Sequence, residues 1–177
     1  MSSLHTAHTA DLDADVLGAA RALLYDVFGD DLEEYDWEHA LGGVHALVWE
    51  GEELIGHASV VMRRLLHDGR ALRCGYVEAV AVRADRQRRG HGGALMEAIE
   101  RVIRGAYDVG ALGGTDAGAA LYLRRGWRLW QGPLFALTPD GVVRTADADG
   151  AVYVFPVSAP LDLSGELVCD WRDGDVW

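Results

Sequence analysis

The sequence predicts a mixed α/β fold with a central sheet that is mainly antiparallel. Strand patterns joined by short turns fill residues 44–82, a long amphipathic helix pattern covers residues 93–107, and more strand patterns follow a shorter helix. Tight turns favour antiparallel pairing, because parallel pairing needs a crossover of a dozen or more residues. With 177 residues, of which 50% are hydrophobic, we expect residues 1–177 to form one domain.

The first predicted element is a helix over Leu12–Phe28. Its apolar residues recur at helical spacing, and the run Gly29-Asp30-Asp31 ends it. The acidic stretch Asp31–His39 follows, with the aromatic residues Tyr35 and Trp37. We interpret this stretch as a loop or short helix that borders a site.

A hairpin and a third strand are predicted next. Val44–Trp49 and Leu54–Met62 flank a turn, and Asp68-Gly69 marks another turn before Leu72–Val82. Both faces of the third strand are largely apolar apart from Glu78, so this strand should be central and buried. Strict alternation places on one face Tyr76, Glu78, Val80 and Val82.

The second half alternates helices and strands. Gly93–Tyr107 has one apolar stripe opposite a charged one, and Ala117–Arg125 is a shorter helix that ends at Gly126, a typical C-cap residue. An acidic loop is expected at Asp140–Gly150. Strands are predicted at Val109–Leu112, Trp127–Trp130, Gly132–Leu137 and Ala151–Pro156.

The net charge of −12 is distributed unevenly. Residues 1–62 hold thirteen acids and one Arg, residues 63–128 hold thirteen Arg and seven acids, and residues 129–177 hold eight acids and two Arg. A basic middle between acidic ends suits a protein that handles an anion and a cation together, although acidic ends also serve solubility alone. The overall sign argues against nucleic acid as a partner, because nucleic acid requires a basic face.

Composition also limits location and metal content. No apolar run approaches the roughly 20 residues that span a bilayer, and the N-terminus lacks the pattern of a secretory signal. We therefore expect a cytoplasmic protein with no membrane partner. Cys74 and Cys169 are too few for a disulfide framework. The histidines show no metal spacing, so we assign no metal and interpret His45 and His57 as core or surface residues.

The turn Gln87–Gly93 is the clearest candidate binding site. It joins a buried strand to an amphipathic helix, and its glycines let the backbone come close to a ligand. The N–H groups and dipole of the first helical turn favour an anion, and Arg86, Arg88 and Arg89 add positive charge. These features predict a site for a diphosphate.

The pattern Gln87-x-x-Gly90-x-Gly92 resembles the coenzyme motif of the GCN5-related N-acetyltransferase (GNAT) superfamily. The resemblance covers residues from about 10 to 156 and implies the GNAT acyltransferase fold with acetyl-CoA as cosubstrate. It implies that backbone amides of the turn hold the pyrophosphate and that Val80–Val82 pairs with the pantetheine arm as an added strand. The implied coenzyme-binding residues are Val80, Ala81, Val82, Gln87, Arg88, Arg89, Gly90, His91, Gly92 and Gly93.

Two residues are candidates for the proton transfers of an acetyl transfer. Glu78 is either an ion-paired structural residue or an anionic contact for the substrate ammonium that also acts as a base through water. Tyr122 lies in Leu121-Tyr122-Leu123-Arg124-Arg125-Gly126-Trp127, and the resemblance implies that it protonates the leaving thiolate. A buried tyrosine with a satisfied hydroxyl is the structural alternative.

Longer segments are similar to the aminoglycoside 2′-N-acetyltransferases of mycobacteria and related bacteria. They are Asp36–Leu47, Leu72–Asp85 and Cys169–Trp177. This similarity implies direct attack of an amine on the thioester, drug resistance and a homodimer. It further implies that residues 157–177 close the substrate site, with the Trp177 carboxylate in a catalytic role. The implied substrate-binding residues are Asp31, Asp36, Glu78, Ala79, Gly113, Asp147, Asp175 and Trp177.

The sequence departs from this family at two places. Gly113-Gly114-Thr115 replaces a serine-containing segment before the tyrosine, and Ala148 occupies an acidic position. These changes concern the substrate range. The acidic ends independently favour a polycationic acceptor. The alternatives are acetylation of another amine, such as a polyamine, an amino sugar or a protein N-terminus, and a non-catalytic acetyl-CoA-binding module.

Overall fold

The computed structural model describes residues 1–177 and confirms the mixed α/β class. The helices are α1 (Ala14–Phe28), α2 (Glu34–His39), α3 (His91–Ala106) and α4 (Asp116–Arg124). The strands are β1 (Ser2–His8), β2 (Val44–Glu50), β3 (Glu53–His67), β4 (Arg70–Val82), β5 (Val109–Gly113), β6 (Arg128–Leu129), β7 (Leu134–Thr138), β8 (Gly141–Arg144), β9 (Val152–Pro156) and β10 (Leu167–Cys169). Two compact units are present, residues 1–61 with 77–102 and residues 62–76 with 103–177. The strands β3 and β4 and the helix α3 each contribute residues to both.

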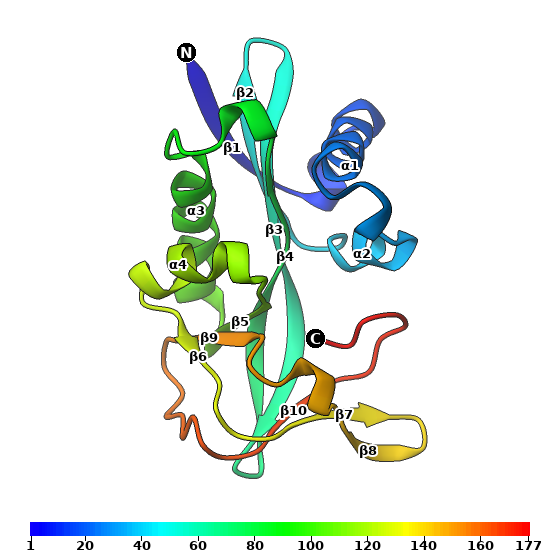
Figure 1. Cartoon of the computed structure of the whole chain (residues 1–177), viewed down its shortest axis with the longest axis vertical. Coiled ribbons are helices and arrows are strands. Elements are labelled where there is room, and N and C mark those ends of the chain that lie inside the picture. The colour runs from blue at the N-terminus through cyan, green and yellow to red at the C-terminus, as the bar shows by residue number, and fades with distance from the viewer. The chain divides into compact units, whose positions relative to one another are not determined.

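The first unit contains β1, β2 and parts of β3 and β4. β2 pairs with β1 on one side and with β3 on the other, and a bulge interrupts the second ladder between Val48 and Trp49. The helices α1 and α2 lie on one side of these strands and α3 on the other (Figure 1). Leu24, Trp37 and Leu47 pack in the apolar core between α1, α2 and β2. Asp13 caps α1, because its side chain accepts a hydrogen bond from the Val16 N–H at 2.9 Å.

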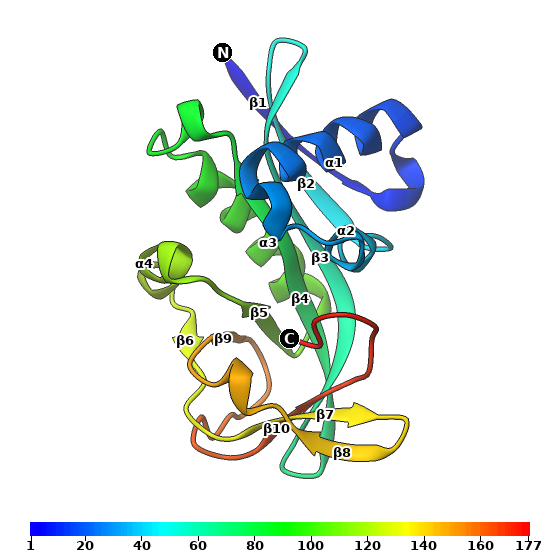
Figure 2. The ribbon, with the colours of Figure 1, turned by 45° about the vertical axis from the view of Figure 1, so that its right-hand side comes forward.

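The second unit contains the parallel pairings. β5 pairs in parallel with Cys74–Tyr76 of β4 and antiparallel with β9, which also pairs with β6. β10 pairs antiparallel with β3 and in parallel with β7, which forms a hairpin with β8. The C-terminal segment, red in Figure 2, leaves β10 and ends beside β5. The strand ladders are therefore mainly antiparallel, as predicted.

Several predicted boundaries were wrong. β3 continues to His67 because Arg63 is a buried strand residue held by Asp170, although its charge indicates a strand end. β8 lies inside the predicted loop Asp140–Gly150, and its exposed residues carry no burial pattern. β1 was missed for the same reason. β1 forms by antiparallel pairing with β2, and β8 forms by antiparallel pairing with β7.

The predicted alternation along β4 was also wrong. Ala79 has a φ of 52°, outside the extended region, so the two faces do not continue regularly through it. Glu78, Ala79 and Val80 are consecutive and all partly exposed, whereas the sequence predicted a strand that is buried on both faces. β4 thus bends at the residue that follows Glu78.

Candidate active site

The predicted diphosphate turn follows β4 in the first unit. A 3-10 turn at Ala84–Arg86 leads to Gln87, whose side-chain Nε2 donates to the Val82 carbonyl at 3.1 Å. Arg88 and Gly90 have positive φ values of 58° and 90°, which bend the chain into α3. The Ala94 N–H donates to the Gly90 carbonyl at 3.0 Å and continues the helical ladder. The earlier N–H groups of α3 lie before this bond, at the positive end of the helix dipole.

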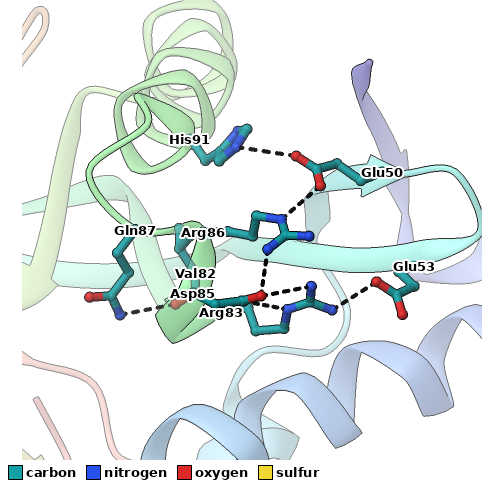
Figure 3. Close-up of polar contacts among 8 residues, drawn as sticks. All are labelled: Glu50, Glu53, Val82, Arg83, Asp85, Arg86, Gln87 and His91. Carbon is teal, nitrogen blue, oxygen red and sulfur yellow. Dashed lines mark hydrogen bonds and ion pairs between the residues drawn. The ribbon is translucent and has the colours of Figure 1, made fainter.

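The arginines around the turn divide into two groups, and Figure 3 shows the first of them, Arg83 and Arg86. Arg83 binds Asp85 and Glu53, and Arg86 donates to Glu50 at 2.7 Å and to Asp85 at 2.5 Å. The hydrogen bond from Arg86 lowers the pKa of Glu50, so both groups are charged and neutralise one another. Arg86, which was expected to add positive charge beside the turn, is therefore paired with carboxylates. Arg88 and Arg89 are exposed in the same turn.

His91, the first residue of α3, also lies near this network. Its Nε2 is 3.9 Å from Glu50 Oε1, the carboxylate that binds Arg86 (Figure 3). Glu50 is the last residue of β2, so its contact with His91 links the end of that strand to the start of α3. These contacts hold the start of α3 next to the end of β2 and to the turn after β4.

Four predicted substrate-binding residues line one cavity in the second unit. The cavity has a volume of about 250 Å³. Asp147 and Asp175 contribute carboxylates to it, and Gly113 and Trp177 complete this set. The other lining residues are Gly114, Thr115, Ala148, Ala151 and Val152. Ala151 and Val152 were missed, since a short apolar run at the start of β9 predicts only a strand.

The chain terminus is held at the edge of this cavity. The Trp177 indole Nε1 donates to Thr145 Oγ1 at 2.8 Å, and its backbone N–H donates to Asp175 Oδ1 at 3.1 Å. Trp177 is only 6% exposed. A Cβ atom at Gly113 would lie 3.2 Å from the Trp177 carbonyl oxygen, closer than ordinary contact. Glycine at 113 thus allows the terminal residue to lie directly against β5.

Tyr122 lies on α4 and is 8% exposed. Its ring packs 5.7 Å from the Tyr153 ring and 6.3 Å from the Trp127 ring, centroid to centroid. Burial, with a smaller contribution from Tyr153, raises the pKa of the Tyr122 hydroxyl, so this group is protonated at neutral pH. A Cβ atom at Gly118 would lie 2.6 Å from the Tyr122 ring. Gly118 therefore makes room for the tyrosine, a role that glycine four residues earlier in a helix could have indicated.

The remaining predicted residues lie in the first unit. Asp31 is exposed at the end of a 3-10 turn. Asp36 is partly buried and accepts a hydrogen bond from the Glu33 N–H at 2.9 Å, which caps α2. Glu78 and Val80 are partly exposed on either side of the bend at Ala79. No cluster of three or more His, Cys, Asp or Glu is arranged to hold a metal ion, and no helix has the length and apolarity to cross a membrane.

Comparison with known proteins identifies the family of the chain. Residues 9–127 match the model of the acetyltransferase (GNAT) family. The chain belongs to the GNAT family of acetyltransferases. GNAT enzymes use acetyl-CoA, and the match includes the turn Gln87–Gly93 and Tyr122.

Relatives support this assignment in sequence and in fold. The chain is 51% identical to an aminoglycoside 2′-N-acetyltransferase of Mycolicibacterium fortuitum, over 98% of this chain and 93% of that protein. ElaA of Escherichia coli has a similar structure, with a TM-score of 0.63 and 20% identity over 87% of this chain and 99% of ElaA. A GCN5-related N-acetyltransferase of Kribbella flavida has a TM-score of 0.59 and 20% identity over 75% of this chain. This GNAT chain spans only 34% of the Kribbella protein.

Proposed function

We propose that this GNAT acetyltransferase transfers the acetyl group of acetyl-CoA to the 2′-amino group of aminoglycosides. The observation that carries the proposal is the 51% identity, over 98% of the chain, to the Mycolicibacterium aminoglycoside 2′-N-acetyltransferase. The acceptor amine attacks the thioester directly in a ternary complex, and modification of the drug confers resistance. The enzyme acts in the cytoplasm as a homodimer.

The cavity in the second unit suits a polycationic acceptor. Asp147, Asp175 and the terminal carboxylate of Trp177 provide negative charge at or beside it. Aminoglycosides carry several ammonium groups at neutral pH, so a set of carboxylates both attracts and orients them. Asp31, Asp36, Glu78 and Ala79 extend the acceptor contacts in the proposal. The residues 157–177 close the acceptor site, since they include the segment that ends at the cavity.

The turn Gln87–Gly93 fits the coenzyme. The start of α3 presents backbone N–H groups to an anion, and the exposed Arg88 and Arg89 add positive charge beside them. These groups and the side chain of His91 hold the pyrophosphate, and Val80–Val82 holds the pantetheine arm through backbone hydrogen bonds. β5 pairs with β4 only at Cys74–Tyr76, so this pairing does not extend to Val80–Val82. Acetyl-CoA supplies the acetyl group as an activated thioester.

The reaction needs two proton transfers, one to a base and one from an acid. Glu78 binds the acceptor ammonium and accepts its proton through water, or the terminal carboxylate of Trp177 does so. Tyr122 donates its hydroxyl proton to the sulfur of the leaving group, which its raised pKa supports because the hydroxyl is protonated at neutral pH. The proton that leaves the amine is thereby balanced by one that reaches the thiolate.

A second acceptor class is supported by the cavity wall. Gly113 and Ala148 both line the cavity, and both are places where this sequence departs from the aminoglycoside 2′-N-acetyltransferase pattern. The small side chains at these two positions change the shape and the charge of the wall, so the alternative acceptor is another amine, such as a polyamine or an amino sugar.

Release of free thiol from acetyl-CoA tests the proposal. Purified protein is given a panel of aminoglycosides with a 2′-amine and matched drugs that have a 2′-hydroxyl instead. We expect thiol release and a mono-acetylated product only with the 2′-amine drugs. Release with polyamines alone would favour the second acceptor class, and release with the 2′-hydroxyl drugs would contradict the assigned position.

A further inference from the structure

A line of buried hydrogen bonds runs through the first unit and ends on the backbone at Ala79. Thr9 Oγ1 is 2.8 Å from His45 Nε2, His45 Nδ1 is 2.9 Å from His57 Nε2, and His57 Nδ1 is 2.8 Å from the Ala79 carbonyl oxygen. Both imidazoles are fully buried. The line joins the end of β1 to the bend in β4 through the two neighbouring strands β2 and β3.

The carbonyl at one end of this line and the neutral state of the two rings set the direction of every bond in it. A carbonyl oxygen only accepts, so His57 Nδ1 carries the hydrogen and donates it to Ala79. With a neutral ring, His57 Nε2 then accepts from His45 Nδ1–H, which leaves His45 Nε2 as an acceptor. The Thr9 hydroxyl hydrogen therefore goes to His45 Nε2 at 2.8 Å and not to its other acceptor, the Gly43 carbonyl at 3.2 Å. Burial lowers the pKa of each histidine to about 4, so both rings are neutral at physiological pH. Each ring is therefore fixed in one tautomer and one orientation.

The acceptor at the end of the line is a strained residue. Ala79 has a φ of 52°, which is unfavourable for a side chain other than glycine and persists only where its surroundings hold it. It lies between Glu78, assigned to the acceptor amine, and Val80, assigned to the coenzyme. Because a trans peptide places C=O and N–H on opposite sides, the Ala79 carbonyl that faces His57 directs the Val80 N–H away from the buried histidines.

We propose that His57, oriented by His45 and Thr9, is a positioning residue for acetyl transfer. It holds the Ala79–Val80 peptide in the bent conformation and thereby sets the directions of the Glu78 side chain and the Val80 N–H. The inference rests on the proposed function for the roles of Glu78 and Val80. The Thr9, His45 and His57 side chains themselves touch no reacting atom in this proposal, and their effect is transmitted through the backbone of β4.

Paired substitutions at His57 test the role of its Nδ1–H. In His57→Asn the amide nitrogen occupies the place of Nδ1 and keeps a donor for the Ala79 carbonyl, whereas His57→Leu removes the donor. We expect His57→Leu to lower kcat by about 10- to 100-fold, as a misplaced reacting group does, at temperatures well below its melting point. The Kd for coenzyme A should stay within about 3-fold. We expect His57→Asn to recover most of kcat.

Two further variants provide the controls. Ser59→Ala changes another fully buried polar residue of β3 outside the line, and its kcat should equal that of the wild type. Thr9→Val is an isosteric change that removes the hydrogen bond between Thr9 and His45. It replaces His57→Leu as the test variant if that variant does not fold. We expect Thr9→Val to lower kcat by a few-fold with an unchanged Kd for coenzyme A. The proposal would be overturned if His57→Leu and Thr9→Val fold and keep the wild-type kcat, or if His57→Asn and His57→Leu lose kcat to the same extent.

Nitrogen NMR of histidine-labelled protein separates this inference from the proposed function. Both buried rings should show protonated Nδ1 and unprotonated Nε2 at pH 7, with His57 Nδ1–H slow to exchange. This result requires no substrate. Absence of acetyl transfer with every 2′-amine drug would contradict the proposed function alone, whereas Nε2–H tautomers would overturn the hydrogen-bonded line even in an active enzyme.

Discussion

The Arg63 guanidinium donates a hydrogen bond to the Val176 carbonyl at 2.8 Å, one residue before the chain ends. The same group donates to Asp170 Oδ1 at 2.7 Å and to the Asp170 carbonyl at 2.8 Å, and it lies over the Tyr76 ring. Arg63 is only 4% exposed. One buried side chain of β3 therefore holds both the start and the end of the C-terminal segment that reaches the cavity.

Arg63→Met should loosen this segment. Three hydrogen bonds are lost, and their acceptors are left partly exposed, so we expect a loss of about 1–3 kcal/mol in the free energy of unfolding. We also expect the KM for the acceptor to rise, since Asp175 and Trp177 lose their support. Urea denaturation and steady-state kinetics measure the two effects. Arg64→Met, an exposed neighbour with the same charge change, is the control. An unchanged KM in Arg63→Met would show that the cavity does not depend on this clamp.

The Gly90→Ala variant tests the conformation of the coenzyme turn. A Cβ atom at Gly90 meets nothing within 4 Å, but its φ of 90° is unfavourable for alanine. We expect a cost of about 1–2 kcal/mol to stability or a rearranged turn, and in either case a weaker Kd for acetyl-CoA by calorimetry.

A glycine in α3, the helix that follows the turn, provides the control. Gly105 is exposed in the last turn of α3, has space for a Cβ, and has no positive φ. Gly105→Ala should stabilise the protein by up to about 1 kcal/mol and leave acetyl-CoA binding unchanged. Equal binding by the Gly90 and Gly105 variants would argue against a role of the turn in holding the coenzyme.

The sequence predicted the features that depend on neighbouring residues. The turn after β4 and the helix that follows it come from local spacing, and both are present, although α3 begins at His91, inside the range predicted as turn. The partners of charged residues did not follow, because Arg86 meets Glu50 and Arg63 meets Asp170 only after distant segments pair. The same holds for His45 and His57, which the sequence could only assign to core or surface. Their hydrogen-bonded line requires the pairing of β2 with β3 and the bend at Ala79.

Tyr122→Phe should lower kcat by about 100-fold while the Kd for acetyl-CoA changes little. The hydroxyl is required in its protonated form, and burial raises its pKa above the ordinary value of 10.0. A kcat decline caused by loss of this proton therefore has its midpoint at a higher pH than the titration of an ordinary tyrosine. Tyr153→Phe, which alters the neighbouring buried ring, is the control and should keep most of kcat. Stopped-flow kinetics and equilibrium binding separate the two constants, and a parallel loss in both would contradict the acid role.

The buried histidines predict a stability that falls between pH 6.5 and pH 4. The pKa of His45 and of His57 is about 4 in the folded protein, mainly through burial, against an ordinary value of 6.5. The unfolded chain therefore binds more protons within this window, and stability is lost as pH falls through it, by about 1.4 kcal/mol per pH unit for each group. Below pH 4 this contribution levels off. Carboxylates with lowered pKa values, such as Asp108 at about 2, lose their contribution at lower pH.

Replacing one histidine isolates this effect. His57→Asn removes one titrating group but keeps the hydrogen bond to Ala79, so its unfolding free energy should fall less steeply from pH 6.5 to pH 4 than that of the wild type. Urea denaturation at half-unit pH intervals measures the two slopes. Ser59→Ala, which removes no titrating group, should retain the wild-type slope. Identical slopes in wild type and His57→Asn would mean that His57 binds its proton equally in the folded and unfolded states, in contradiction to its burial.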